Sequence, residues 1–508
     1  MKRLSFLTIS VMLLLFLTSC SKNQSRKLVP EDALFVMRLD VAKIQDKAGM
    51  NDGKSTLKEW FKEQIENSSM DKELSKKMLA IVDDPTASGI DFTEPVYLYF
   101  SGDMRTKVDA GMVGAIASKG DLTDLMEALT KEMGNEVEVE EGDGGVKYIY
   151  ANGTALVYNG DWFFMGASND IEETITMLNE RADGKGSLID NKAFAQMEEK
   201  EGLMQMLFLG SGMEGMKTTR EMELAFKELE KILPEGVELK DIASLTDLML
   251  NDGELLITGE AVPLSDEVKE WINKYDEIAN DITPDLAQYA SNEMLNIFFS
   301  ADASAFFEIL QPMIKEQMGD EELKVIKDLV KELDGTLALD LYGFSEDGTP
   351  QVSAYLGTKS NKALSFVAEN LGDELEAAGT DEYLIPIREY DWFEEVDTIK
   401  GYSAVGYKNG MTYYVSNPEY AFSVPGEKFP VKELKGKAIY MRFNFGFLEN
   451  LAKMTGDEEG EFLEKVAETY DFAECYYESA GKSVFRITTK SKDTNPVQAI
   501  FKLIEEYL

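Results

Sequence analysis

The feature that most constrains the fold is an order of segments that recurs along the chain. An apolar strand is followed by a short helix, a longer helical stretch, two strands in a hairpin and a closing helix. The first copy begins at 33–40, and its hairpin joins 96–100 to 110–117. The third copy begins at 294–300, and its hairpin joins 336–342 to 351–356. Such self-similarity indicates one supersecondary unit used several times.

Both of these copies continue into an extra block of strands. The predicted strands are 146–150, 154–158 and 162–165 in the first block, and 402–407, 412–415 and 421–424 in the second. Each block contains an Asn-Gly pair, Asn159-Gly160 and Asn409-Gly410, between apolar runs. Asn-Gly is the strongest short hairpin signal, because type I′ turns need positive φ angles.

The second and fourth copies are shorter and occupy 203–275 and 438–507. Hairpins dominate all four copies, and alternating strand-helix-strand units are missing. This pattern predicts an α+β fold with mainly antiparallel sheets and helices packed on one face. We expect a duplicated body of two tandem halves, 30–284 and 285–508, built from four related strand-helix-hairpin-helix units.

The start of the chain is typical of a secretory signal peptide. Basic residues precede an apolar run over 4–17, which is too short to span a bilayer. The run ends in Leu17-Thr18-Ser19-Cys20, which resembles the lipobox of bacterial lipoproteins. The resemblance implies cleavage after Ser19 and acylation of Cys20, which several acyl chains would make a stable anchor. We predict a signal peptide at 1–19 and a flexible polar tether at 20–29.

The residues after Cys20 indicate the membrane to which the lipoprotein is sorted. Ser21 stands where inner-membrane retention in Gram-negative lipoproteins uses Asp, which favours the outer membrane. The stretch 21–27 is basic rather than acidic, whereas an acidic run directs some lipoproteins to the cell surface. We therefore expect the body to lie in the periplasm, with the cell surface as the alternative.

The lipobox, the opening at 29–40 and the tandem layout together resemble an uncharacterised family of lipoproteins from Gram-negative gut anaerobes. This protein family is catalogued as a domain of unknown function. The resemblance implies a lipid-anchored envelope protein and supplies no catalytic residues.

Charge and two scarce residue types exclude several functions. The net charge is −43, or near −45 once Lys2 and Arg3 are removed, so the surface repels nucleic acids and favours basic partners. Histidine is absent, which excludes Ser-His-Asp catalysis and imidazole metal sites. Apart from Cys20 only Cys475 remains, so no internal disulfide can form. We expect Cys475 to be a buried structural thiol in a strand.

Several local motifs resemble sites but are better interpreted as turns. Residues 210–215 spell the G-x-G-x-x-G of dinucleotide sites, without the parallel strand-helix-strand unit that such sites need. Residues 52–55 and 480–483 echo a P-loop without its upstream glycine. The acidic loops 138–143 and 456–461 lack the ligand spacing of calcium loops. We therefore predict no catalytic residue, no cofactor and no metal.

Aromatic residues beside carboxylates suggest an alternative. The segment 390–395 and the pair Asp161-Trp162 have the side chains that stack on sugars and hydrolyse glycosides. With 94 acidic residues, however, chance pairs are expected, and hairpin aromatics covering a core edge explain both segments. The 25 methionines are interpreted as core filler.

These inferences favour a non-enzymatic binding or structural module anchored to the outer membrane by lipid, with a basic protein or a glycan as its partner. The alternative is a carboxylate-dependent hydrolase of envelope glycans. A third hypothesis is a lipoprotein that sequesters peptides or lipids in an apolar groove between its halves.

Overall fold

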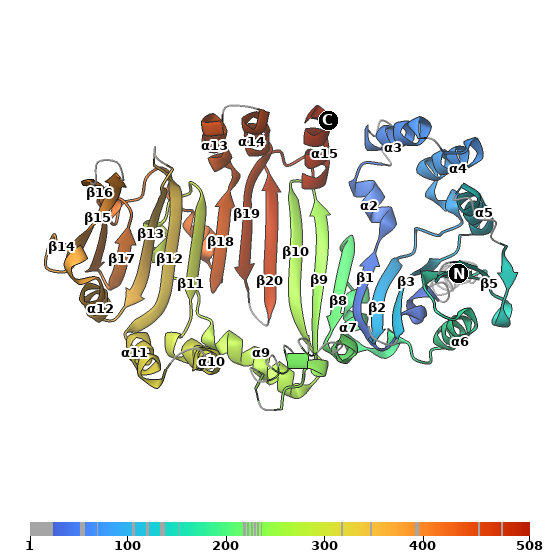
Figure 1. Cartoon of the computed structure of the whole chain (residues 1–508), viewed down its shortest axis with the longest axis horizontal. Coiled ribbons are helices and arrows are strands. Elements are labelled where there is room, and N and C mark those ends of the chain that lie inside the picture. The colour runs from blue at the N-terminus through green and yellow to red at the C-terminus, as the bar shows by residue number, and fades with distance from the viewer. Residues whose placement is uncertain are drawn as a thin grey trace, which may run out of the picture. The chain divides into compact units, whose positions relative to one another are not determined.

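The computed structural model describes residues 24–507 with internal gaps (Figure 1). The gaps are 51–55, 69, 104–106, 118–120, 133–137, 152, 217–219, 221–222, 225–226, 228–229, 231–232, 235, 316–318, 346–347, 392–395, 456–457 and 479–480. The chain divides into two compact units. Unit 1 runs to Glu230 and also holds Glu238–Met249 and Val262–Ser265; unit 2 holds Lys231–Val237, Leu250–Ala261 and Asp266 onward.

Unit 1 contains an antiparallel sheet in the order β9-β8-β1-β2-β3-β7-β6-β5-β4. Its strands are β1 (Ala33–Leu39), β2 (Val96–Asp103), β3 (Lys107–Ala115), β4 (Glu140–Glu141), β5 (Lys147–Ala151), β6 (Thr154–Tyr158), β7 (Trp162–Ala167), β8 (Met204–Leu209) and β9 (Ile242–Asn251).

Unit 2 contains an antiparallel sheet in the order β10-β20-β19-β18-β11-β12-β13-β17-β16-β15-β14. Its strands are β10 (Glu254–Pro263), β11 (Leu295–Ser300), β12 (Leu333–Phe344), β13 (Pro350–Thr358), β14 (Glu376–Ala377), β15 (Glu382–Asp391), β16 (Val396–Lys408), β17 (Met411–Val415), β18 (Ile439–Asn444), β19 (Tyr470–Tyr477) and β20 (Lys482–Thr489).

The predicted α+β class with antiparallel sheets is confirmed. To one side of β1, unit 1 has the order β2-β3-β7-β6-β5-β4, and to the same side of β11, unit 2 has the corresponding order β12-β13-β17-β16-β15-β14. To the other side, β8-β9 in unit 1 corresponds to β18-β19 in unit 2. The strands of the first predicted copy and the first strands of the second lie in the sheet of unit 1, whereas the last strand of the second copy, β10, pairs with β20 in the sheet of unit 2. The four-unit repeat and the division at 284/285 stay predictions; unit 2 also takes in 250–261 and 266–284.

One predicted strand is wrong, and one long strand was missed together with the two-residue strands β4 and β14. Residues 421–424 form a turn after η9 (Pro418–Tyr420), and Phe422 has a positive φ of 58°. This segment is apolar because Phe422 packs on the core rings of Tyr355 and Tyr413, so its composition reflects burial. The long missed strand is β15, whose proline and charged residues hide its extended character.

The helices lie mostly beyond the ends of the strands in each unit (Figure 1). In unit 1 they are α2 (Val41–Lys47), α3 (Thr56–Asn67), α4 (Lys72–Asp83), α5 (Leu122–Glu132), α6 (Ile171–Ala182) and α7 (Lys192–Glu198). In unit 2 they are α9 (Asp266–Ile278), α10 (Ala303–Lys315), α11 (Asp320–Val330), α12 (Lys362–Leu371), α13 (Leu448–Thr455), α14 (Glu458–Thr469) and α15 (Pro496–Tyr507). No helix in the described part of the chain is long and apolar enough to cross a membrane.

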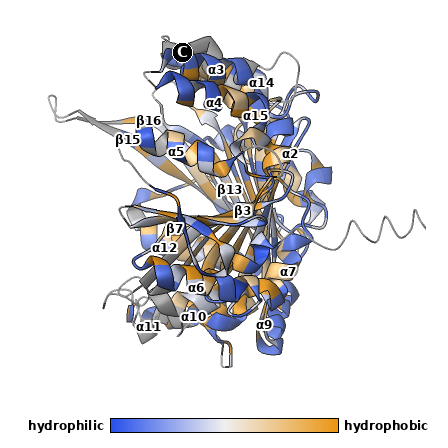
Figure 2. Ribbon diagram, turned by 90° about the vertical axis from the view of Figure 1, so that its right-hand side faces the viewer, coloured by the Kyte–Doolittle hydropathy of each residue, from blue (hydrophilic) through white to orange (hydrophobic). Residues whose placement is uncertain are grey.

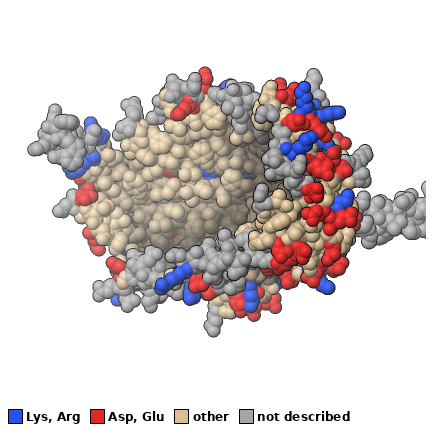
Figure 3. Space-filling model, turned by 45° about the vertical axis from the view of Figure 1, so that its right-hand side comes forward, with Lys and Arg blue, Asp and Glu red and all other residues tan. Residues whose placement is uncertain are grey.

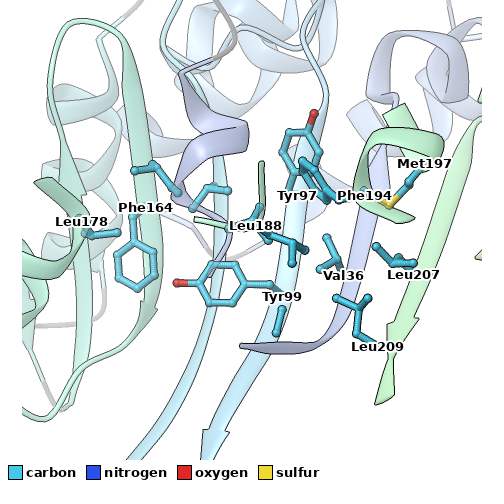
Figure 4. Close-up of a cluster of buried hydrophobic side chains, with 14 of the residues drawn as sticks. Val36, Tyr97, Tyr99, Phe164, Leu178, Leu188, Phe194, Met197, Leu207 and Leu209 are labelled. Carbon is cyan, nitrogen blue, oxygen red and sulfur yellow. The ribbon is translucent and has the colours of Figure 1, made fainter. Parts of the chain in front are cut away.

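The core of unit 1 lies on one face of its sheet (Figure 4). Tyr97, Tyr99 and Phe164 project from the strands toward α6, α7 and two short 3₁₀ turns, η1 (Ser25–Leu28) and η4 (Leu188–Asp190). α6 begins where it does because the Asp170 carboxylate accepts hydrogen bonds from the Glu172 and Glu173 amides. On the opposite face, α5 packs over a cluster from β5, β6 and β7 that extends to Met112 of β3.

The C-terminal part of the predicted tether, residues 25–29, packs on the core of unit 1. Ser25, Leu28 and Val29 are fully buried, and the Leu188 amide donates a hydrogen bond to the Val29 carbonyl. Two apolar residues joining a core outweigh the polar composition of the surrounding stretch.

The core of unit 2 is covered differently. Its described members outside the sheet lie on η7 (Pro284–Tyr289), η10 (Val431–Leu434) and connecting segments, and none lies on an α-helix. Tyr289 stacks on Tyr355 with ring centroids 4.7 Å apart, and Phe429 packs on Phe298 at 4.9 Å. On the opposite face, α14 and α15 pack over the end of β19 and β20. Toward the other end of the strands, Phe306 of α10 packs on Phe299 of β11, and Asp276 of α9 accepts a hydrogen bond from the Tyr477 hydroxyl of β19.

The predicted packing of helices on one face is therefore corrected. Helices contribute to both faces of the sheets, and much of each sheet carries none. Hydropathy colouring shows apolar residues along the strands (Figure 2).

Candidate functional site

The sheet of unit 2 has one face that helices contact mainly near the two ends of its strands. Strand pairing aligns its outward side chains in rows that cross seven strands. The central row is Ile257, Phe485, Cys475, Met441, Ile297, Leu339 and Ala354. One flanking row is Leu255, Ile487, Ala473, Phe443, Leu295, Leu341 and Val352. The other is Gly259, Ser483, Tyr477, Ile439, Phe299, Leu337 and Leu356.

We call these three rows the open face. They contain no charged residue among their described members, and the most exposed of their large apolar side chains are Ile439 at 44% and Met441 at 41%. In the space-filling view the strand surface is a broad tan area with few charged side chains, and red and blue gather on the surrounding elements (Figure 3). An antiparallel sheet that faces water normally presents polar side chains on its wet face. The open face does the reverse.

Unit 1 carries a comparable row. Its members, from β9 to β7, are Thr246, Met206, Met37, Leu98, Met112 and Met165. None of these methionines is fully buried; Met112 packs against the cluster beneath α5, and Met165 is 39% exposed. The interpretation of the methionines as core filler is therefore incomplete. Methionine is flexible and polarisable, which suits a surface that adapts to apolar ligands.

The opposite, covered face of unit 2 holds a buried polar row. Its members are Arg486, Glu474, Arg442, Asn296, Asp340 and Ser353. The Glu474 carboxylate is fully buried; it accepts a hydrogen bond of 2.6 Å from the Tyr440 hydroxyl and pairs with Arg486 Nη1 at 3.1 Å. The Arg442 guanidinium lies 3.7 Å from the centre of the Phe472 ring. Such pairs hold a buried charge in place by satisfying it.

Asp340 lies further along this polar row. Its carboxylate accepts hydrogen bonds from the Ser291 amide at 2.8 Å, the Ser291 hydroxyl at 3.0 Å and Asn296 Nδ2 at 2.8 Å. Loss of hydration in the core nevertheless raises the pKa of Asp340 to about 6, because the hydrogen bonds offset only part of the desolvation.

Lys437 borders the same face. Its ammonium lies 4.4 Å from the ring centre of Tyr440 and 3.8 Å from that of Tyr476. Burial lowers the pKa of Lys437, although the Glu474 carboxylate opposes this shift. Burial also raises the pKa of the Tyr440 hydroxyl, and its hydrogen bond to Glu474 adds to the increase. This cluster is closed within the core, and its ring contacts and ion pairs account for it as a stabilising element.

Unit 1 has a shorter polar row at the corresponding strands. Gln205 accepts a hydrogen bond of 2.5 Å from Arg38 Nη1 and donates one of 2.7 Å to Asp247. Arg38 Nε lies 3.6 Å from Glu198 of α7, and the Tyr97 hydroxyl donates to the same carboxylate. Burial raises the pKa of Glu198, and Arg38 partly counters that effect.

A surface pocket of about 350 Å³ lies between α14, α15 and the end of β20. Its lining mixes apolar and polar side chains, and Lys465 within it pairs with Glu468 at 3.0 Å. No cluster of three metal-ligating side chains occurs among the described residues, at this pocket or elsewhere. The pocket offers no arrangement that points to a reaction.

The structure places the glycine-rich and acidic motifs apart from one another. Residues 210–215 lie in a 3₁₀ turn, η5 (Gly210–Met216). A Cβ on Gly212 would lie 2.4 Å from Leu34 Cα, so this glycine permits close backbone packing. Residues 138–143 lead into and out of β4. Cys20, residues 52–55, and parts of 456–461, 480–483 and 390–395 lie outside the described residues.

The pair Asp161-Trp162 belongs to the β6–β7 hairpin. The Asp161 carbonyl accepts a hydrogen bond from the Ile116 amide at 3.2 Å. Trp162 is only 3% exposed and packs in the core of unit 1, so its ring is not available to stack on a sugar.

Cys475 lies in β19 as predicted, but its burial is only partial. The residue is half-buried on the open face, between Phe485 and Met441. Burial raises the pKa of its thiol, which keeps the group in its protonated, less reactive form.

The open face itself was missed by sequence reasoning, although a signal was present. β11 reads Leu-Asn-Ile-Phe-Phe-Ser, and β18 reads Ile-Tyr-Met-Arg-Phe-Asn. In β18, charged Arg442 alternates with apolar neighbours, a pattern that normally places the charged side chain on the solvent-exposed face of the sheet. In the structure the two faces are exchanged: Arg442 is buried and Met441 is exposed.

Comparisons with known proteins give one family and two weak structural likenesses. No curated protein matches the chain. Two crystal forms of TP0453 match weakly: form IV at 14% identity over 47% of this chain and 79% of that one, with a TM-score of 0.27, and form III at 13% over 51% and 88%, with a TM-score of 0.28. The model of a domain of unknown function, DUF4836, matches residues 26–433. The chain therefore belongs to the DUF4836 family.

Proposed function

We propose that this protein is a lipid-anchored binding module of the cell envelope, without catalytic activity, that holds an apolar ligand on its open face. The observation that carries the proposal is the open face: three rows of seven residues without a charge. The rows offer apolar contact, and burial keeps the one thiol among them, Cys475, in its protonated, less reactive form.

The size of the open face supports a binding role. Strands lie about 4.8 Å apart and alternate residues about 7 Å apart, so three rows on seven strands cover roughly 400 Å². Contiguous apolar patches of this size on soluble proteins are often functional. Solvation of such a surface is costly, and a ligand that covers it removes that cost.

The anchor is proposed to be Cys20, and the fold supports a short connection to it. The described chain begins at Gln24, directly before the η1 turn, whose Ser25 and Leu28 are buried. Four residues span at most about 14 Å, so an acylated Cys20 would hold unit 1 close to the bilayer. We place the anchor in the outer membrane and the body in the periplasm, on the strength of Ser21 and the basic stretch that follows.

We further propose that the two units arose by duplication of one half. The common strand order supports this proposal, as do the polar rows that include Asp247 on β9 and Glu474 on β19. The hydrolase alternative gains no support, because no described carboxylate pair lines a site for a sugar.

The anchor is tested by cell fractionation and protease shaving. The wild-type protein is expected in the outer-membrane fraction and protected in intact cells, and a Cys20→Ala variant is expected to be soluble in the periplasm. A membrane-bound Cys20→Ala variant contradicts the anchor, and digestion of the wild type from outside contradicts the periplasmic placement.

The binding role is tested with Nile red, whose fluorescence rises in apolar sites. Met441→Glu places a charge at the centre of the open face, and Val325→Glu makes the same change on α11, where Val325 is 45% exposed. Met441→Glu is expected to lower dye binding at least fivefold, and Val325→Glu to leave it unchanged. Equal binding by all three proteins contradicts the proposal.

A further inference from the structure

We propose that the open face of unit 2 binds the hydrocarbon chains of individual lipid molecules. This inference rests on the proposed binding function and names its ligand class. Four features of the molecule support it: the hydrogen-bonding capacity of the face, its dimensions, its borders and the charge of the chain.

The open face has almost nothing to offer a polar ligand. Its backbone amides and carbonyls lie within the antiparallel ladder. Its side-chain hydroxyls belong to Ser483 and Tyr477, and the Tyr477 hydroxyl already donates to Asp276 at 2.7 Å. A protein partner normally forms about one hydrogen bond per 100–200 Å² of interface, whereas a hydrocarbon chain needs none.

The dimensions of the face suit an acyl chain. Seven strands at about 4.8 Å spacing make each row roughly 29 Å long. The tails of one bilayer leaflet span about 15 Å, so a chain lies on a row within the boundaries of the sheet. Phe485, Met441 and Ile297 occupy the middle strands of the central row. Aromatic, thioether and branched side chains there make close contact with a flexible chain.

The border of the face disfavours an intact bilayer as the ligand. Ile487 of the open face packs against the cluster of Leu503 on α15 and Val466 on α14. These helices therefore rise on the same side as the open face and at one end of it. A flat bilayer surface would meet them before it covered the rows, whereas a single lipid fits beside them.

The charge of the chain disfavours a second copy. A net charge of −43 makes two copies repel each other, and the open face has no charged pair to offset that repulsion. The same charge favours lipids that are zwitterionic or that carry one carboxylate over strongly anionic ones.

The test measures binding of radiolabelled palmitate to the purified mature chain carrying Cys20→Ala. Met441→Glu and Val325→Glu are made in this background, and thermal unfolding checks that both fold. Palmitate is expected to bind saturably, with a Kd at least tenfold weaker in Met441→Glu and unchanged in Val325→Glu. Phosphatidylcholine vesicles form a second arm, and a 20-residue basic amphipathic peptide a third.

Each other outcome overturns the inference in a distinguishable way. Binding to vesicles without binding of palmitate identifies a bilayer surface as the ligand. Binding of the peptide alone, lost in Met441→Glu, keeps the proposed binding function and replaces lipid by a polypeptide. Palmitate binding that Met441→Glu does not weaken places the lipid elsewhere. No binding in any arm removes both the ligand class and the proposed function.

Discussion

The two faces of the sheet in unit 2 contrast sharply. The covered face buries Glu474, Arg442 and Asp340, each of which is at most 7% exposed. The open face exposes Met441 at 41% and Ile439 at 44%. Charges lie inside and apolar side chains outside, so the covered face is held by an ion pair, hydrogen bonds and ring contacts, and the open face is available to a ligand.

The same contrast appears in unit 1, with a different solution for its polar row. Arg38 is paired with Glu198 from α7, a helix, whereas Glu474 is paired with Arg486 from a neighbouring strand. The strand order is common to both units, but the partner of the buried charge is not. The buried charge of a polar row can therefore be paired with a residue of a helix or with a residue of a neighbouring strand.

The largest effect is expected for Glu474→Ala. It leaves Arg486 and the Tyr440 hydroxyl without their buried acceptor, which typically costs about 3–5 kcal/mol. Urea unfolding should show this loss, and Met441→Ala on the open face should lose less than about 1 kcal/mol. Equal losses for the two variants would erase the distinction between the faces.

A smaller loss is expected for Arg38→Met in unit 1. The variant keeps most of the apolar stem of Arg38 but removes the cationic partner of Glu198. Because burial already raises the pKa of Glu198, this carboxylate can take up a proton instead of remaining an unpaired charge. We expect a loss of about 2 kcal/mol at pH 7 and a smaller one at pH 5, from urea unfolding at both values. A loss that grows at pH 5 would contradict this account.

Asp340 on the covered face makes the free energy of unfolding depend on pH. Its pKa is raised from 3.8 to about 6 in the folded state, so the folded protein binds this proton more tightly than the unfolded chain. The stabilisation is complete below about pH 4 and is lost as the pH rises through 6, at a cost on the order of 3 kcal/mol. Asp340→Asn should remove this component from unfolding curves measured between pH 4 and 7. An unchanged pH profile in Asp340→Asn would assign the dependence to other groups.

The smallest effect compares the two Asn-Gly turns. Gly410 has a φ of 77° and follows Asn409 at 54°, whereas Gly160 is not among the residues with positive φ. Gly410→Ala should cost about 1 kcal/mol and Gly160→Ala a few tenths, because only the first forces alanine into the left-handed region. Thermal unfolding of the pair tests this, and a larger cost at Gly160 would show that the turns are built otherwise.

Sequence reasoning predicted most strands, the hairpins and the α+β class, because alternation and Asn-Gly turns are local signals. It placed the closing helices correctly at 362–371 and 496–507. It failed at 421–424 and β15, where burial of Phe422 and charges on an outer strand reversed the usual pattern. Which face of a strand is covered depends on segments distant in sequence, such as η7 and η10, and no local pattern reports it. The open face could therefore not be assigned before the fold was known.

The most direct test of the open face uses Cys475, which lies between Phe485 and Met441 in the central row. In the mature chain carrying Cys20→Ala it is the sole thiol. Its labelling by a maleimide is followed at a mildly alkaline pH of about 8.5, with and without saturating palmitate. We predict slow but measurable labelling of the folded protein, because burial raises the pKa of the thiol, and at least fivefold protection by palmitate. Labelling only in urea, or a rate that palmitate leaves unchanged, would contradict the account.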